Sequence, residues 1–148
     1  MSTEEHKTIA RRWSEELWSK GALAVADEII APTYVRHDPG DPFVAEGPEG
    51  VKLLVMGLRA QMPNLHITIE DLVAEGDKVV TRYVATGTDT GEFMGKAPTG
   101  KQVRVTAIQI FRIIDGKIVE SWANRDDLGG LRQLGVIPAP GRASQDSQ

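Results

Sequence analysis

The chain has 148 residues, a formal net charge of −4 and no cysteine. This length predicts a single domain, and the lack of cysteine excludes disulfides and thiolate metal sites. The sequence contains no stripe of Lys and Arg residues of the kind that binds nucleic acid, so we expect no nucleic-acid partner. No apolar run is long enough to cross a bilayer, and the first residues, MSTEEHK, carry acids where an export signal carries cations. We therefore expect a cytoplasmic protein without a membrane partner.

Apolar residues at helical spacing predict three helices in the first part of the chain. The first runs over Thr3–Ser19, and the second, Ala22–Ile30, ends before Pro32 because a residue that precedes proline avoids helical angles. The third carries Val51, Leu54, Val55 and Leu58 on one face. Between the second and third helices, Tyr34–His37 is predicted to be extended.

The pattern then changes to the alternation that is typical of strands. Four strands are predicted, at Leu65–Gly76, Asp77–Gly91, Lys101–Ile114 and Lys117–Asn124. Gly76-Asp77 and Asp115-Gly116 suit tight hairpin turns, which predicts an antiparallel sheet. A last short helix is expected over Asp126–Leu134, and we take residues 1–137 as one domain followed by a polar tail, 138–148.

Helices before a curved antiparallel sheet predict an α+β fold with the three helices packed on one sheet face. If Ile114 pairs with Lys117 across the last turn, Gln109 lies opposite Trp122. One face then carries Gln109, Phe111, Ile113, Ile118 and Trp122, and the other carries Ile108, Ile110, Ile114 and Val119. Both faces are apolar, so the face without helices is expected to be covered by a second copy in a homodimer.

Several strings of the sequence together resemble one family. They are EELWSKGALAVADEIIAPTYVRHDP, EFMGKAPTGKQVRV, FRIIDGKIVESW and DLGGLRQLG. The chain resembles the SnoaL-like polyketide cyclases and predicted ester cyclases of the nuclear transport factor 2-like superfamily. The resemblance implies a cone of three helices closed by a curved, mainly antiparallel sheet, with a pocket inside and a short C-terminal helix.

The resemblance also locates the family's acid/base residues. The aspartate that serves an aldol closure in this family falls at Ala123, and the histidine that assists it falls at Gln109. Another position that often holds histidine is Asp89. Asp126 matches an acid that recurs at the start of the last helix, and His37 matches a histidine in the string YVxHxP.

Asp126 and His37 are the candidate catalytic residues, and each has a second interpretation. Asp126 could exchange protons beside Trp122, where apolar surroundings raise the pKa of a carboxyl group, or Asp126 or Asp127 could cap the last helix. His37 could serve as acid or base, or it could be a loop histidine that is bonded to the backbone.

Further residues are candidates for substrate binding. Gln109 and Tyr34 could orient ligand oxygens, and Gln109 could equally bond a neighbouring side chain. Asp89 could pair with His37 or could be a turn residue. The remaining candidates are aromatic or flexible side chains for a pocket wall, which core packing would also explain: Trp13, Trp122, Phe93 and Met94.

These features predict a cofactor-independent enzyme that performs acid/base chemistry, by cyclisation, isomerisation or dehydration, on a small hydrophobic carbonyl or polyketide-like substrate. Three histidines without an HxH or HxxxH pair give no reason to expect a metal. Two alternatives remain open: an epoxide hydrolase with an Asp-activated water, and a non-catalytic protein that binds a hydrophobic small ligand.

Overall fold

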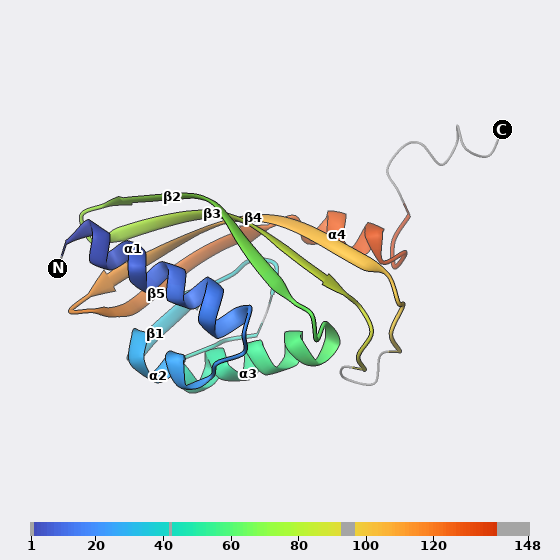
Figure 1. Cartoon of the computed structure of the whole chain (residues 1–148), viewed down its shortest axis with the longest axis horizontal. Coiled ribbons are helices and arrows are strands. Elements are labelled where there is room, and N and C mark those ends of the chain that lie inside the picture. The colour runs from blue at the N-terminus through green and yellow to red at the C-terminus, as the bar shows by residue number, and fades with distance from the viewer. Residues whose placement is uncertain (1, 42, 93–96, 139–148) are drawn as a thin grey trace.

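The computed structural model describes residues 2–41, 43–92 and 97–138 (Figure 1). Its N-terminal part contains the predicted helices, with bounds α1 Thr3–Arg12, the π-helix η1 Trp13–Trp18, α2 Ala24–Ile29 and α3 Gly47–Gln61. The predicted first helix is therefore one continuous element whose second half is wound more widely. Phe93, Met94 and the tail from residue 139 onward lie outside the described residues.

The π-helix η1 sets the position of two tryptophans. Its hydrogen bonds run from residue i+5 to residue i, as in the 3.0 Å bond from the Ser19 N–H to the Ser14 carbonyl. Residues five positions apart thereby come close to the same face, whereas an α-helix would splay them. The ring centroids of Trp13 and Trp18 lie 6.1 Å apart, and Trp13 also contacts Phe111 edge-on at 5.1 Å. The π turn thus brings both indoles to the side that faces the sheet.

The sheet contains five strands, whose bounds are β1 Ile30–His37, β2 His66–Glu75, β3 Lys78–Thr88, β4 Gln102–Ile114 and β5 Lys117–Arg125. Their order is β1-β5-β4-β3-β2, and only the β1–β5 pair is parallel. Asp115 and Gly116 both have positive φ, 49° and 76°, as a tight hairpin turn requires. The chain ends in the short helix α4, Asp127–Gln133.

Helices α1, α2 and α3 lie on one side of the curved sheet (Figure 1). Their apolar stripes pack against the inner face of the sheet and form one main core, whose fully buried members include Leu17, Val55, Phe111 and Ile118. The predicted α+β class and the position of the helices are confirmed. Among the described residues, no helix is long and apolar enough to cross a membrane.

The predicted register of β4 against β5 is wrong by one residue beyond the turn. Ile114 pairs with Lys117 as predicted, but Arg112 pairs with Glu120, so Val119 is left without a partner and forms a bulge. A bulge reverses the faces of all residues that follow it, because side chains in a strand alternate. Gln109 consequently lies opposite Ala123 instead of Trp122.

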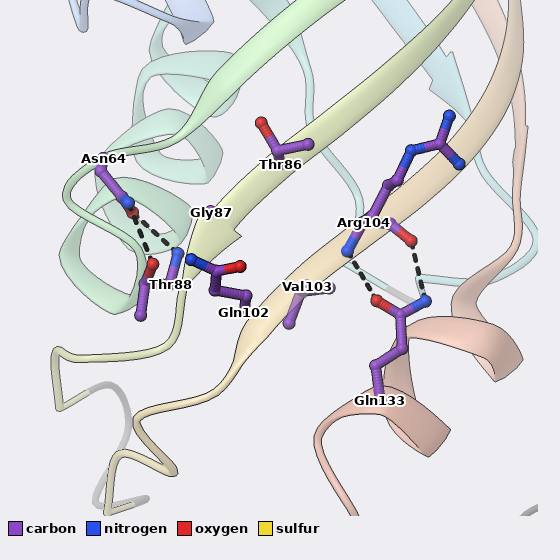
Figure 2. A pocket seen from close by; sticks show the side chains of 8 residues that line it. All are labelled: Asn64, Thr86, Gly87, Thr88, Gln102, Val103, Arg104 and Gln133. Carbon is purple, nitrogen blue, oxygen red and sulfur yellow. Dashed lines mark hydrogen bonds between the residues drawn. The ribbon is translucent and has the colours of Figure 1, made fainter.

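Two side-chain amides close the free backbone edges at the far ends of β3 and β4 (Figure 2). Asn64 accepts from the Thr88 backbone N–H at 2.7 Å and donates to its hydroxyl at 3.0 Å. Gln133 of α4 accepts from the Arg104 N–H at 2.6 Å and donates to the Arg104 carbonyl at 2.9 Å. Each amide replaces a strand neighbour, Asn64 where β2 has not yet begun and Gln133 where β5 has already ended.

Candidate functional site

The bulge at Val119 places polar side chains on the inner face of the sheet, beneath the helices. The register aligns Thr81 with Gln109 and Ala123, and Tyr83 with Ala107 and Arg125. Ser121 lies one row deeper, beside Phe111. Towards the hairpin turn the same face is apolar. The inner face therefore changes along its strands from aliphatic residues to hydroxyls, an amide and then charges.

Tyr34 and Ser121 form the innermost polar pair. The Tyr34 hydroxyl lies 2.7 Å from Ser121 Oγ, and both residues are almost fully buried. Burial raises the pKa of Tyr34 to about 12, although the bond to Ser121 acts in the opposite direction. Tyr34 therefore keeps its proton at neutral pH and can act as a hydrogen-bond donor.

Gln109 is the central polar residue of the inner face. It is 7% exposed, and its side chain forms no hydrogen bond with any described residue. Ala123, which the resemblance aligns with the family's catalytic aspartate, is its direct cross-strand neighbour on β5. The structure thus brings the two family positions together, with an amide and a methyl group in place of an imidazole and a carboxyl.

A charged cluster lies where β1 and β5 end, and we define it by Arg36, Asp38, Arg125 and Asp127. The Asp38 side chain, 2% exposed, accepts from Arg36 at 2.7 Å and from both terminal nitrogens of Arg125. Arg125 also contacts Asp127 at 3.2 Å. Burial lowers the pKa of Arg125, but the bonds and charges of Asp38 and Asp127 outweigh burial, so the net pKa is raised. This cluster fastens the segment after β1 to the end of β5.

Tyr83 lies between this cluster and Thr81 on the inner face of β3. It is 8% exposed, and burial raises its pKa. The nearby charges act on this pKa in both directions: those of Arg125 and Arg36 lower it, and those of Asp38 and Asp127 raise it. Tyr83 therefore remains neutral and supplies a second phenol to the inner face.

His37 and Trp122 lie on the outer face of the sheet. They are register partners in the parallel β1–β5 pair, and their rings stack with centroids 5.4 Å apart. His37 Nε2 lies 2.6 Å from Glu120, whose other oxygen bonds Arg112 at 3.1 Å. The bonds to His37 and Arg112 lower the pKa of Glu120. The predicted position of Trp122 beside Gln109 is thus wrong, because the bulge turns Trp122 away.

Asp126 is the N-terminal cap of α4. Its carboxylate accepts from the Gly129 backbone N–H at 2.9 Å, and the side chain is exposed. Asp127, the other acid of the pair, bonds Arg125. Asp126 and His37 have different polar partners, and the structure does not join them. Their catalytic roles stay predictions.

Asp89 is buried at the base of the loop between β3 and β4. Its carboxylate accepts from the Thr99 N–H at 3.1 Å and from the Thr99 hydroxyl at 2.9 Å, and its backbone pairs with Gly100 and Lys101. It holds the two sides of the loop together across ten residues, and it is not paired with His37, whose partner is Glu120.

Trp13, another predicted site residue, lies over the inner face beside Tyr34, with ring centroids 6.1 Å apart.

A groove of about 470 Å³ lies elsewhere, at the ends of β3 and β4 (Figure 2). Thr86, Thr88, Gln102 and Arg104 line it, and these residues alternate with the inner row of Tyr83 and Ala107. Gly87 and Val103, which share the parity of the inner row, also line it, so the groove belongs to the ends of both strands and not to one sheet face. Within the described ranges, no group of three or more His, Asp or Glu side chains gathers as metal ligands would.

Comparison with known proteins identifies the family. The model of the SnoaL-like polyketide cyclase family matches residues 8–134. The chain belongs to the SnoaL-like polyketide cyclase family. The nogalonic acid methyl ester cyclase of Streptomyces nogalater is 31% identical over 119 residues, which cover 80% of this chain and 89% of the relative. The aklanonic acid methyl ester cyclase DnrD of Streptomyces peucetius is 29% identical, covering 73% and 72%.

Solved structures agree with this assignment. TsrD from Streptomyces laurentii superimposes with a TM-score of 0.81 at 29% identity, covering 93% of this chain and 99% of TsrD. The predicted family and its nuclear transport factor 2-like fold are confirmed.

Sequence reasoning missed several inner-face residues, namely Asp38, Thr81, Tyr83, Ser121 and Arg125. Asp38 precedes a proline and looks like a turn residue. Its partner Arg125 lies 87 positions away, which no local pattern links to it. A usable signal was the alternation of Tyr34 and Arg36 on β1 with Asp38 just after it, which places all three on one face.

The two interpretations of Asp126 predict different effects of two substitutions. Asp126→Ala removes the cap and is expected to lower the free energy of unfolding by about 1 kcal/mol, whereas Asp126→Asn keeps a capping oxygen and is expected to change it little. Urea unfolding measures both. Turnover by the same variants separates the roles: an acid/base carboxyl is lost in both variants, but a cap is lost only in Asp126→Ala.

Proposed function

We propose that the protein is a cofactor-independent enzyme that cyclises a polyketide-like substrate in a hydrophobic pocket between its helices and the inner face of the sheet. Two relatives are named as methyl ester cyclases, and the family model spans most of the chain. We propose the cytoplasm as the location of this reaction. The observation that carries the proposal is the set of neutral donors beneath the helices, Tyr34, Ser121 and Gln109, beside the family's acid position.

Intramolecular aldol closure needs these groups. A carbon beside a carbonyl group loses a proton, the resulting enolate carbon attacks a second carbonyl, and the new alkoxide takes up a proton. Atoms and charge balance without an oxidant or reductant. The barrier lies in the negative charge that develops on oxygen, which preorganised donors stabilise in a water-poor site. Tyr34, which keeps its proton, and the Gln109 amide can supply such donors.

The proton carrier in this proposal is a water molecule beside Ala123. In this proposal the water lies next to the small methyl group of Ala123, and the amide oxygen of Gln109, the cross-strand neighbour of Ala123, accepts a hydrogen bond from it. Acid/base catalysis by a positioned side chain contributes typically about 10²- to 10⁴-fold, so a water in its place gives a slower enzyme.

The two alternatives to this proposal are an epoxide hydrolase and a non-catalytic binding protein. An epoxide hydrolase needs a carboxylate that activates water, and on the inner face Asp38 is already bonded to two arginines. A non-catalytic binding protein would need the same donors and differs only in showing no turnover. No described contact favours either alternative over the cyclase.

Removal of the donors should lower turnover. Tyr34→Phe and Gln109→Leu are each expected to reduce kcat/KM by about a hundredfold, because each removes a donor aimed at developing charge. The assay uses nogalonic and aklanonic acid methyl esters, the compounds in the relatives' names. Asn124→Ala, exposed on the outer face beside Ala123, is the control. Unchanged kcat/KM in both donor variants would contradict the proposal.

Restoring the acid should accelerate the reaction. Ala123→Asp is expected to raise kcat by about tenfold or more, since it places a buried carboxyl of raised pKa beside Gln109. Ala123→Asn, of almost equal volume, is the matched control and should not raise kcat. Equal kcat values for the two variants would show that proton transfer at this position does not limit the rate.

We also propose that two copies associate through the outer face of the sheet. Val73, Ile108 and Ile114 are exposed there, Ile108 by 52%, and within the described part of the chain no helix covers this face (Figure 1). Exposed aliphatic side chains on a sheet face suit a buried interface, and the ion pairs Arg82–Asp71 and Arg112–Glu120 on the same face make this a mixed surface and not a purely apolar one. His37 and Trp122 would then lie within the contact.

The association is testable by light scattering at micromolar concentration. The wild-type protein is expected to have the mass of a dimer, and Ile108→Glu the mass of a monomer, because a charge in the centre of an apolar contact is costly. Leu53→Glu, 57% exposed on α3 at the other side of the sheet, is the control and should remain dimeric. A monomeric wild-type protein would exclude the interface.

A further inference from the structure

Arg59 of α3 is an arginine whose partners are backbone carbonyl groups. Its Nη1 donates to the Trp18 carbonyl at 3.0 Å and to the Ser19 carbonyl at 2.6 Å. Longer bonds reach the Leu65 carbonyl at 3.4 Å and, from Nη2, the Pro63 carbonyl at 3.3 Å. All hydrogen bonds of this side chain to described residues thus go to the backbone. The guanidinium therefore joins chain segments and does not serve as the partner of a side-chain charge.

The two shortest of these bonds lie at the end of the π-helix η1. Trp18 is the last residue of η1, and Ser19 is its C-terminal cap. Carbonyl groups at the end of a helix lack partners within the helix and carry the negative end of its dipole. Arg59 supplies both donors and positive charge at this point, so it stabilises the end of η1 from the neighbouring helix α3.

Two further contacts fix the same end of η1. The Ser19 hydroxyl accepts from the Ile67 backbone N–H at 2.8 Å, which ties this end to β2. Gly21 has a φ of +70°, and a Cβ at this position would lie 2.7 Å from Arg59 Nε. The chain that leaves η1 therefore lies directly against the guanidinium, where glycine permits both the close contact and the positive φ.

The position of the Trp18 indole depends on this attachment. In an α-helix, residues five positions apart point about 140° away from each other, whereas the wider turn of η1 brings the Trp13 and Trp18 rings to 6.1 Å between centroids. Trp18 packs there against a small apolar cluster, which consists of Ile67, Tyr83 and Ala107. If η1 relaxed to an α-helix, Trp18 would turn away from this cluster.

We propose that Arg59 is a positioning residue, which holds the C-terminal end of η1 in its π form and thereby keeps the Trp18 indole against the sheet. It acts through the backbone carbonyls of Trp18 and Ser19. Its effect on turnover rests on the proposed function, whereas its effect on the indole does not.

The two indoles provide a direct measure of this role. Rings this close and inclined at 44° couple, which gives a paired band in the far-ultraviolet circular dichroism. Trp18→Phe removes one indole and defines the size of that band. Arg59→Met keeps most of the aliphatic stem without the donors and should lose most of the band, measured at a temperature at which the variant is fully folded. Arg59→Lys has one ammonium in place of the planar fork and should lose part of it.

Lys52→Met is the matched control. Lys52 lies on the same helix, and its ammonium bonds Asp27 at 2.8 Å and Glu49 at 2.9 Å. Loss of these ion pairs can lower the melting temperature, but the paired band should remain. A merely structural role of Arg59 would give the same result. An unchanged band in folded Arg59→Met, or in Arg59→Lys where Arg59→Met does not fold, would overturn the proposal.

Turnover of the methyl esters gives a second readout. Arg59→Met should raise KM by about tenfold and change kcat by less than about threefold, because Tyr34 and Gln109 stay in place and only one wall of the interior moves. Absence of turnover in the wild-type protein would end the cyclase proposal but would leave the circular-dichroism result intact. Normal wild-type turnover together with an unchanged band in Arg59→Met would end the positioning role alone.

Discussion

One extra residue in the last strand decides which side chains the interior receives. Because Val119 is left out of the β4–β5 register, Ser121, Ala123 and Arg125 face the helices, and Trp122 faces outward. Without the bulge, the β5 side chains beyond this point would face the opposite side of the sheet, and the indole of Trp122 would lie beside Gln109 in place of Ala123. Tyr34 would then lose Ser121, and Asp38 would lose Arg125. The polar interior thus depends on a local irregularity of the backbone.

The elements themselves could be predicted from the sequence, but the register could not. Helical spacing, the proline after α2 and the Asp115-Gly116 turn are local features, and each defines an element from a few adjacent residues. No local sequence pattern predicts the bulge, because the residues of Lys117–Arg125 are compatible with either assignment of their side chains to the two faces of the sheet. The small residues Ser121 and Ala123 on either side of Trp122 were the available indication, because a face crowded by helices favours small side chains.

The π-helix could not be predicted from the sequence for a related reason. Trp13 and Leu17 are four residues apart and fit an α-helix, so the sequence predicted one regular helix. Trp18 does not fit that face, and it is brought to the sheet only by the wider turn. The candidate site was predicted only in part for the same reason. Gln109 lies on a regular stretch of β4 and reaches the interior as predicted, whereas Trp122 follows the bulge in β5 and does not.

Charge balance offers a physical reason for the pair Gln109 and Ala123. An imidazole and a carboxyl side by side in a buried row can neutralise each other, but either one alone would be an uncompensated buried group. Replacement of one therefore favours replacement of the other, and an amide with a methyl group leaves the row neutral. The nearest charges, Asp38 and Arg125, are already paired with each other at the end of the strands. The row between the helices and the sheet is accordingly left without an unpaired charge, and its polar groups are hydroxyls and an amide.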